Sequence, residues 1–372
     1  MKLIIERAAL LKALGHVQSV VERRNTIPIL SNVKLEASAI ELALRATDMD
    51  LEVVESVNAS VATPGGATVP AHTLYEIVRK LPDGAEVKLD ATGGGDRLTL
   101  VCGRSRFALA CLPVDDFPVM AAGDLPYRFR LGAASLRSLI DRTRFAISTE
   151  ETRYYLNGIY IHAATHDGVE VLRAVATDGH RLARVQVPLP EGAGGMPGII
   201  VPRKTVTELR KLIDEADGEV EVALSDGKVQ FTVGPATLTS KLIDGTFPDY
   251  ERVIPVANDK TLDVVCRDFA DAVERVSAIS SERSRAVKLK LANGTLELTA
   301  FSPEHGTATE ELPVNYAGEA MEIGFNCRYL LDITQNIEGE NVRFRMADAA
   351  SPTVLGEATD GNATYVLMPM RV

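Results

Sequence analysis

The sequence contains no tryptophan, few cysteines and no long apolar run. Its four cysteines, Cys102, Cys111, Cys266 and Cys327, form no CxxC pair and no Cys/His cluster with zinc spacing, so we expect reduced, structural thiols. No window approaches the roughly 18 apolar residues that cross a membrane, and MKLIIERAALLKAL carries charges where a signal peptide is apolar. These absences predict a cytoplasmic protein without a membrane partner.

Basic residues are also in deficit, because 40 Lys and Arg face 51 Asp and Glu, which gives a formal net charge of −11. Binding nucleic acid by global attraction rests on many Lys and Arg contacts to phosphate, so the composition argues against that mode. Hydrophobic residues make up 46% and charged residues 24%, as in ordinary globular proteins. A chain of 372 residues exceeds what one hydrophobic core usually organises. We therefore expect two or three domains.

Three segments of the chain resemble one another. They are LALRATDMDLEVV at residues 42–54, VLRAVATDGHRLARV at 171–185 and, more weakly, LELTAFSPEHGTA at 296–308. Aligning Ala46, Ala176 and Ala300 places the copies 130 and 124 residues apart. Such a period indicates a repeated structural unit.

A second feature repeats in the same register. It consists of TVPAHTLYEIVRKL, IVPRKTVTELRKLI and GFNCRYLLDITQNI, in which Pro70, Pro202 and Asn326 lie 132 and 124 residues apart. Pro and Asn suit a helix start, and the following apolar spacing predicts a helix. A third feature, LACLPVDDFP against TSKLIDGTFP, places Phe117 and Phe247 130 residues apart.

Each repeat also opens with an amphipathic helix, in RAALLKALGHVQSVV, ASLRSLIDRTRFAI and RDFADAVERVSAI. Alternating runs such as GEVEVAL, GKVQFTV and GTLELTA predict antiparallel strands joined at Asp-Gly or Asn-Gly turns. The fold class is therefore α+β, with three tandem repeats of two helices packed on antiparallel sheets. We expect domains at 1–126, 127–256 and 257–372, with linkers near residues 126 and 256.

The stretch ATDGHRLARV at residues 176–185 has the residue types of an active site. A hydrolase hypothesis would make His180 the general base and Asp178 its orienting group, but one residue separates the two and the pattern identifies no nucleophile. The first repeat keeps Thr47-Asp48 and then reads Met49-Asp50-Leu51. Asp178 is therefore predicted to be a turn carboxylate of the repeat, and any added function should lie in Gly179, His180 and Arg181.

The Gly-rich segment EGAGGMPG at residues 191–198 lacks the Lys-Ser/Thr of a phosphate-binding loop and the helix that follows such a loop. We interpret it as a solvated loop.

Longer motifs carry a family resemblance. YYLNG (154–158), ATDGHRLA (176–183), VPRK (201–204), SKLIDGTFPDY (240–250) and MPMR (368–371) are similar to the bacterial DNA polymerase III beta subunit family, the sliding clamps, over the full length. The resemblance implies a head-to-tail homodimer whose six domains form a ring around duplex DNA, without sequence specificity. It also implies a processivity factor with no catalytic residue, no cofactor and no metal.

The resemblance further implies a peptide-binding pocket between the second and third domains. Its ligands would be linear peptides of the clamp loader, the replicative polymerase alpha subunit, translesion and repair polymerases and mismatch-repair proteins. The matching positions are Leu156, Thr177, Gly179, His180, Arg181, Leu182, Pro248, Arg252, Val253, Val366, Leu367, Met368, Pro369 and Met370. Two methionines suit a pocket that accepts many sequences, because the thioether side chain repacks readily.

Two further sets follow from the resemblance. The positions that contact DNA in the family are Arg24, Arg153, Tyr154, Arg203 and Lys204, and those at the dimer interface are Phe107, Leu109, Ala278 and Ile279. Other basic residues expected on polar helix faces or loops are Lys12, Arg23, Arg79, Lys80, Arg104, Arg106, Arg137, Arg142, Arg144, Arg210, Lys211, Arg283 and Arg285. A ring needs only weak phosphate contacts, so the net negative charge can lie on its outer surface.

The chain departs from the family at two places. His72-Thr73 replaces residues that are often basic in relatives, and Pro352 replaces a hydroxyl found in some of them. Besides the sliding clamp, two hypotheses remain: a hydrolase centred on His180, and a three-domain peptide-binding scaffold without a role on DNA.

Overall fold

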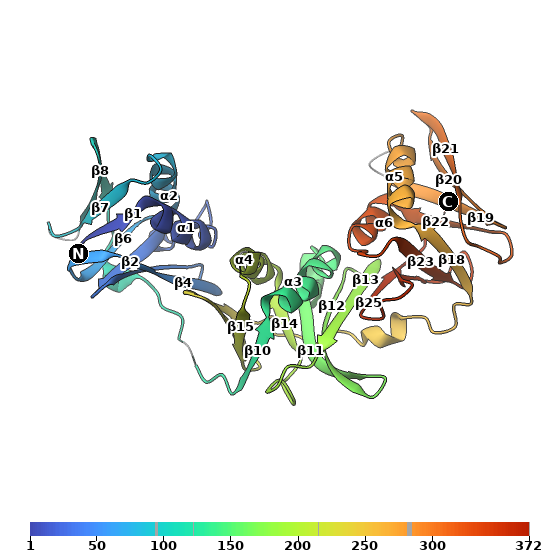
Figure 1. Cartoon of the computed structure of the whole chain (residues 1–372), viewed down its shortest axis with the longest axis horizontal. Coiled ribbons are helices and arrows are strands. Elements are labelled where there is room, and N and C mark those ends of the chain that lie inside the picture. The colour runs from blue at the N-terminus through green and yellow to red at the C-terminus, as the bar shows by residue number, and fades with distance from the viewer. Residues whose placement is uncertain (94–95, 122, 215, 281–284, 372) are drawn as a thin grey trace. The chain divides into compact units, whose positions relative to one another are not determined.

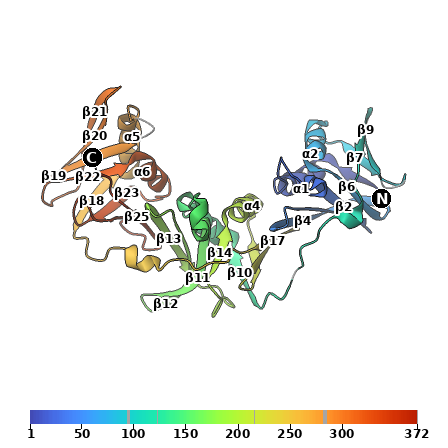
Figure 2. The same ribbon diagram turned by 180° about the vertical axis from the view of Figure 1, so that it is seen from behind.

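The computed structural model describes residues 1–93, 96–121, 123–214, 216–280 and 285–371 (Figure 1; Figure 2). Arg283, expected among the basic loop residues, lies outside these ranges. Within them, no helix has the length and apolar character needed to cross a bilayer.

The α-helices of the described residues come in pairs, as the repeat predicts. They are α1 (Arg7–Gln18) and α2 (Ala71–Lys80), α3 (Ala133–Asp141) and α4 (Arg203–Asp214), and α5 (Cys266–Ser277) and α6 (Cys327–Thr334). Asn326 caps α6, and its side chain accepts the Arg328 N–H at 3.0 Å, which confirms the helix start expected there. The helix α3 is shorter than predicted, because the chain leaves it after Asp141 and forms the 3₁₀-helix η3 (Arg144–Ala146).

Two long sheets each join strands from neighbouring repeats. One has the order β10 (Tyr127–Gly132), β15 (Glu219–Leu224), β16 (Lys228–Val233), β17 (Ala236–Lys241), β4 (Leu51–Asn58), β3 (Glu41–Thr47), β2 (Asn32–Ser38) and β6 (Gly65–Pro70). The other has the order β14 (Ile199–Pro202), β11 (Gly158–His166), β12 (Val169–Thr177), β13 (Arg181–Pro188), β25 (Ala363–Leu367), β24 (Thr353–Glu357), β23 (Asn341–Met346) and β18 (Lys260–Val265).

Two shorter sheets contain strands of a single repeat each. The first has the order β5 (Ser60–Thr63), β1 (Lys2–Glu6), β7 (Glu86–Asp90), β8 (Arg97–Cys102) and β9 (Ser105–Ala110). The second has the order β21 (Gly306–Pro313), β20 (Thr295–Ser302), β19 (Ala286–Ala292) and β22 (Met321–Asn326). The remaining 3₁₀-helices of the described residues are η1 (Pro28–Ser31), η2 (Val114–Asp116), η4 (Glu151–Leu156) and η5 (Tyr250–Val253).

The joins between repeats are antiparallel strand pairs. Leu51 on β4 lies opposite Ser240 on β17, and Arg181 on β13 lies opposite Leu367 on β25. Each pairing satisfies backbone groups that an isolated repeat would leave exposed at a sheet edge. The chain therefore divides into two compact units that cut across the repeats. Unit 1 comprises Met1–Arg137, Pro190–Pro197 and Lys204–Leu242, and unit 2 comprises Ser138–Leu189, Gly198–Arg203 and Ile243–Val372.

The helix pairs cover sheet faces through their apolar sides. In unit 1, α1 lies beside α2 and packs on β3 and β4, and in unit 2, α5 lies beside α6 and packs on β20 and β21 (Figure 1; Figure 2). The buried residues of α5 are Cys266, Phe269, Ala272, Val273 and Val276, at the three- and four-residue spacing of one helix face. The cores of both units therefore follow the apolar periodicity of the sequence.

Arg142 was expected on a polar helix face, and this prediction was wrong. Its side chain is buried in unit 2 and donates to Glu357 at 3.2 Å, to Asp360 at 3.3 Å and to the Tyr365 hydroxyl at 3.3 Å. A buried guanidinium requires such partners, because an unpaired charge in the interior is costly. Arg142 therefore contributes to the interior, away from any phosphate.

The cysteine thiols are free, as predicted. Cys102, Cys266 and Cys327 are buried and Cys111 is half-buried. Burial raises the pKa of Cys266 to about 11, which keeps this thiol protonated at neutral pH.

Candidate functional site

The strand-exit turn between β12 and β13 is held by its own side chains. The Thr177 hydroxyl donates to the Arg181 carbonyl at 2.7 Å, and Asp178 Oδ1 accepts the N–H groups of His180 at 2.9 Å and Arg181 at 3.0 Å. Gly179 has φ of +87°, and an added Cβ would lie 2.5 Å from Nη1 of Arg153. Glycine therefore suits this position both conformationally and sterically.

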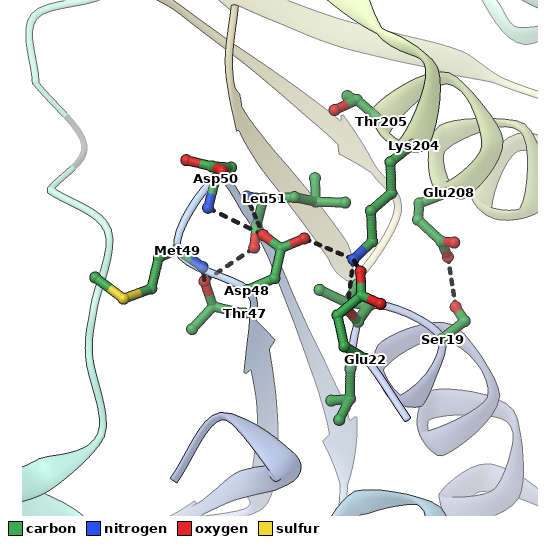
Figure 3. Close-up of polar contacts among 12 residues, drawn as sticks. Ser19, Glu22, Thr47, Asp48, Met49, Asp50, Leu51, Lys204, Thr205 and Glu208 are labelled. Atoms are coloured by element: carbon green, nitrogen blue, oxygen red, sulfur yellow. Dashed lines mark hydrogen bonds and ion pairs between the residues drawn. The ribbon is translucent and has the colours of Figure 1, made fainter. Parts of the chain in front are cut away.

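The first repeat builds the same turn between β3 and β4 (Figure 3). The Thr47 hydroxyl donates to the Leu51 carbonyl at 2.9 Å, and Asp48 Oδ1 accepts the N–H groups of Asp50 at 2.9 Å and Leu51 at 2.7 Å. Met49 occupies the position of Gly179 with φ of +77°. The prediction that Asp178 is a turn carboxylate is therefore confirmed.

A cavity of about 330 Å³ lies beside the second turn, entirely within unit 2. It is lined by Arg153, Tyr155, Leu156, Thr177, Gly179, His180, Arg181, Leu182, Pro248, Asp249, Tyr250, Val253, Val366 and Met368. Leu182 lies opposite Val366 where β13 pairs with β25, so the join between the second and third repeats forms part of its wall. Apolar lining with a few polar groups is typical of a ligand-binding pocket.

Most residues predicted for the pocket line this cavity, and four do not. Arg252 is exposed and pairs with Asp249 at 2.7 Å, whereas Leu367 is fully buried. Pro369 and Met370 also lie outside the lining found for the described residues, and the Met370 N–H donates to the Gly324 carbonyl at 2.8 Å.

Sequence reasoning missed four lining residues. Tyr155, Asp249 and Tyr250 are neighbours of predicted positions and lie in the quoted motifs YYLNG and SKLIDGTFPDY. Arg153, predicted to contact DNA, also lines the cavity, and its guanidinium pairs with Glu150 at 2.7 Å. Adjacency to the motif residues was the signal that could have identified them.

A polar cluster behind the cavity fixes Tyr250. The Tyr250 hydroxyl lies 2.9 Å from His162 Nε2 and accepts from Arg173 at 3.3 Å. Arg173 is buried and also donates to Glu251 at 2.6 Å and to Gln186 at 2.9 Å. Burial lowers the pKa of His162, and the charge of Arg173 adds to this effect. A neutral His162 can donate from Nδ1 to the Ala163 carbonyl, at 2.9 Å, and accept at Nε2.

Lys204 extends from the first turn of α4 toward the first-repeat turn (Figure 3). Its ammonium donates to Asp48 at 2.6 Å, to Glu22 at 2.6 Å and to the Val20 carbonyl at 3.0 Å. Burial lowers the pKa of this ammonium, but the two carboxylates outweigh the burial and leave the pKa raised. Its three N–H donors therefore have three acceptors in the same chain.

The other residues predicted to contact DNA lie at the surface. Arg24, Tyr154 and Arg203 are exposed. Arg137, expected on a polar helix face, donates to the carbonyls of Ile213 at 2.7 Å and Ala216 at 2.9 Å, so it supports the C-terminal end of α4.

His72 makes contacts within the first repeat. The His72 ring lies 2.7 Å from Gln18 Oε1 and 3.0 Å from the Val21 carbonyl, so it ties α2 to the end of α1.

The residues predicted for a dimer interface lie on β9 and after α5. Phe107 and Leu109 alternate with exposed neighbours on β9, the last strand of its sheet. Ala278 is exposed at the C-cap of α5, and Ile279 is half-buried.

Comparison with known proteins agrees with this architecture. The DNA polymerase III beta subunit family matches with its N-terminal domain at residues 1–121, its central domain at 130–249 and its C-terminal domain at 251–371. The chain belongs to the DNA polymerase III beta subunit family. Beta sliding clamps are non-enzymatic processivity factors of DNA replication, so the hydrolase hypothesis for His180 is excluded.

Similar proteins cover the full chain. The beta sliding clamp of Caulobacter vibrioides is 57% identical over 372 residues and that of Pseudomonas aeruginosa is 42% identical over 373, with 100% of both chains covered in each case. A structure of the Caulobacter crescentus clamp has a TM-score of 0.98 at 57% identity, covering 100% of this chain and 99% of the other. A Bartonella birtlesii clamp bound to griselimycin has a TM-score of 0.97 at 50% identity, with both chains fully covered.

Proposed function

We propose that two copies of this chain close into a six-domain ring around duplex DNA and tether the replicative polymerase for processive synthesis. The domains would follow the repeats at 1–126, 127–256 and 257–372, and the protein would act in the cytoplasm. The observation that carries this proposal is the pattern of sheet edges. Two joins between repeats are made within the chain, and β9 and β21 are the equivalent strands that remain at sheet edges.

The repeat alignment supplies the register of this third join. Leu51 lies opposite Ser240, and Arg181 lies opposite Leu367. The equivalent positions are His305, directly before β21, and Ala110 at the end of β9. Pairing β21 of one copy with β9 of the other in this register places Ala308 opposite Phe107 and Gly306 opposite Leu109.

Side-chain character supports that register. Phe107 and Leu109 would share a face with Ala308 and Glu310, and Glu310 is bound on its own chain by Arg275 of α5 at 3.0 Å. Ala278 and Ile279 follow α5, so all four predicted interface residues would gather on the helix side of the new sheet. On the other face, Arg106 would lie diagonally across from Glu311, and such opposite-charge pairs stabilise antiparallel strands.

Contact with DNA would be weak and independent of sequence. We propose Arg24, Arg153, Tyr154 and Arg203 as phosphate contacts, whereas Lys204 must first leave Asp48 and Glu22. Because a closed ring is retained by topology, few contacts suffice and the net charge of −11 is compatible with the role.

The cavity of unit 2 would be the docking site for partners. Its apolar lining suits an extended peptide with an apolar or aromatic end. By the same proposal, the clamp loader, the polymerase alpha subunit, translesion and repair polymerases and mismatch-repair proteins would carry such peptides. The predicted residues outside the lining, Arg252, Leu367, Pro369 and Met370, would act at its margin or support it.

The test is retention on DNA after loading. The protein should stay on a nicked circular plasmid during gel filtration and dissociate once a restriction enzyme linearises the plasmid. Equal retention on both forms would contradict the ring. Failure to be retained on circular DNA, with intact peptide binding, would favour the scaffold hypothesis. Light scattering should give twice the chain mass of 40.1 kDa.

A further inference from the structure

Arg181 lines the cavity, yet its guanidinium is directed into a cluster of other groups. Nη1 donates to Asp332 of α6, Nη2 donates to the Phe145 carbonyl at 2.6 Å, and Nε donates to Asp178 at 3.1 Å. The guanidinium also lies over the Tyr329 ring, 4.2 Å from its centroid, and 5.1 Å from that of Phe145. Its side chain is only 10% exposed, so the charged group is already committed within unit 2.

The residues on either side of Arg181 contact the C-terminal strand, so the backbone at Arg181 connects two walls of the cavity: the turn and that strand. The next residue, Leu182, lies opposite Val366, and the carbonyl of the preceding residue, His180, accepts the Met368 N–H at 2.9 Å. Leu182, Val366 and Met368 all line the cavity. A shift of the Arg181 backbone would therefore move both the turn and the C-terminal strand that faces it.

The helix α6 presents two side chains to Arg181. Tyr329 and Asp332 are three residues apart, so they lie on one face of the helix. Tyr329 also stacks on His180, with ring centroids 6.4 Å apart. The third repeat thus holds the turn of the second repeat by one ring and one carboxylate.

The first repeat shows that this arrangement is particular to the cavity. Its turn also receives an ion pair from the second helix of the next repeat, but there the acid is Asp48 of the turn and the base is Lys204 of α4. The position of Arg181 is taken by Leu51, and that of Asp332 by Glu208, which instead contacts Ser19 and Lys211. The Arg181–Asp332 pair therefore has no counterpart at the other join.

We propose that Asp332 is a positioning residue for peptide docking. It acts through Arg181: the carboxylate compensates the charge of the largely buried guanidinium and sets the spacing between the turn and the C-terminal strand. This inference rests on the proposed peptide-binding function of the cavity. Without the carboxylate, the guanidinium would turn toward other acceptors and move Leu182 with it.

The test compares full-length variants in binding a fluorescein-labelled pentapeptide that ends in Leu-Phe, followed by fluorescence anisotropy. Asp332→Asn keeps the shape of the side chain and removes its charge, and we expect about tenfold weaker binding. Asp332→Glu restores a carboxylate and should bind within about threefold of wild type. The matched control is Asp271→Asn, which removes an exposed α5 carboxylate paired with Arg267 at 4.0 Å.

Several outcomes decide the proposal. Equal affinity of wild type and Asp332→Asn overturns it, as does a failure of Asp332→Glu to recover binding while its urea midpoint matches that of wild type. If Asp332→Asn is unstable, Asp332→Ser replaces it in the test, and wild-type affinity in a folded Asp332→Ser variant overturns the proposal. No binding by wild type itself would instead refute the proposed docking function.

Discussion

Lys204 Nζ lies 2.6 Å from Asp48 Oδ2, and the two residues belong to different repeats. The same ammonium lies 2.6 Å from Glu22, so two carboxylates of the chain pair with its single positive charge (Figure 3). Lys204 is predicted to contact DNA, yet in this structure it ties α4 to the first-repeat turn.

We therefore predict that Lys204→Met leaves the salt dependence of DNA binding unchanged. Loss of a true phosphate contact would reduce the slope of log K against log salt by about 0.9. The measurement is a salt titration of the clamp on labelled duplex, with Arg24→Met as the comparison that should lower the slope. Asp48→Asn discriminates further. If Lys204 serves DNA, Asp48→Asn should strengthen binding more in the wild-type chain than in Lys204→Met, and that difference would contradict our assignment.

The pocket prediction concerns Met368, which is 40% exposed and lines the cavity. Met368→Asp places a carboxylate where the apolar end of a peptide would pack, and desolvating it should weaken binding by about thirtyfold. Isothermal calorimetry with the Leu-Phe pentapeptide measures the effect. Val169→Asp is the control, because Val169 is 61% exposed and outside the lining. Similar losses in both variants would point to a general defect.

The interface prediction uses Arg106 and Glu311. Arg106→Glu should weaken the dimer, raising its dissociation constant by up to about tenfold, because it brings two negative charges together at the proposed join. Adding Glu311→Arg in the same chain should restore part of the dimer. Sedimentation velocity measures the dimer fraction of the single and the double variant. The control is Arg345→Glu, which changes an exposed residue of β23 and should remain dimeric. A double variant as monomeric as the single one would argue against the register.

The pH prediction follows from His162, whose pKa is lowered by burial. The unfolded chain takes up a proton on this residue as the pH falls below about 6.5, while the folded chain resists, so stability is lost in that direction. Urea midpoints at pH 7.5 and 5.5 should therefore differ less for His162→Gln than for wild type. The exposed His305→Gln should keep the wild-type difference. If the midpoints of His162→Gln differ between the two pH values as much as those of wild type, His162 is not the cause of the pH dependence.

The stability prediction concerns two arginines near the end of α3. Arg142→Met leaves Glu357 and Asp360 without their buried cation, and we expect a loss of about 3–5 kcal/mol in the free energy of unfolding. Arg144→Met breaks an exposed pair with Asp141, at 3.2 Å, and should cost at most about 1 kcal/mol. Urea denaturation followed by circular dichroism compares them. Equal losses in the free energy of unfolding would show that burial of the ion pair does not determine its contribution to stability.

Local patterns predicted the helices and most strands, because helical and strand periodicity is set by nearby residues. The join of β4 to β17 could not be predicted in this way, since its partners Leu51 and Ser240 are far apart in the sequence and share no local signal. Arg142 was misplaced for a similar reason: its helix pattern indicates an exposed face, whereas Glu357 and Tyr365 cover it from the third repeat.

The candidate site was predicted by the family motifs, whereas the residue types of ATDGHRLARV alone suggested a hydrolase. Comparison of the two turns correctly separated Asp178, shared with Asp48, from Gly179, His180 and Arg181, which are particular to the second copy. Asp332 could not be predicted from local patterns, because its proposed role depends on a contact between elements from two repeats.

The division into units offset from the repeats has a consequence for how the chain comes apart. A fragment cut at a repeat boundary, such as residue 126, would separate β4 from β17 and divide a continuous sheet. Truncation at these boundaries should therefore yield fragments that aggregate through exposed strand edges, rather than domains that fold independently. The boundaries between repeats therefore lie inside the two compact units, within the continuous sheets that join neighbouring repeats.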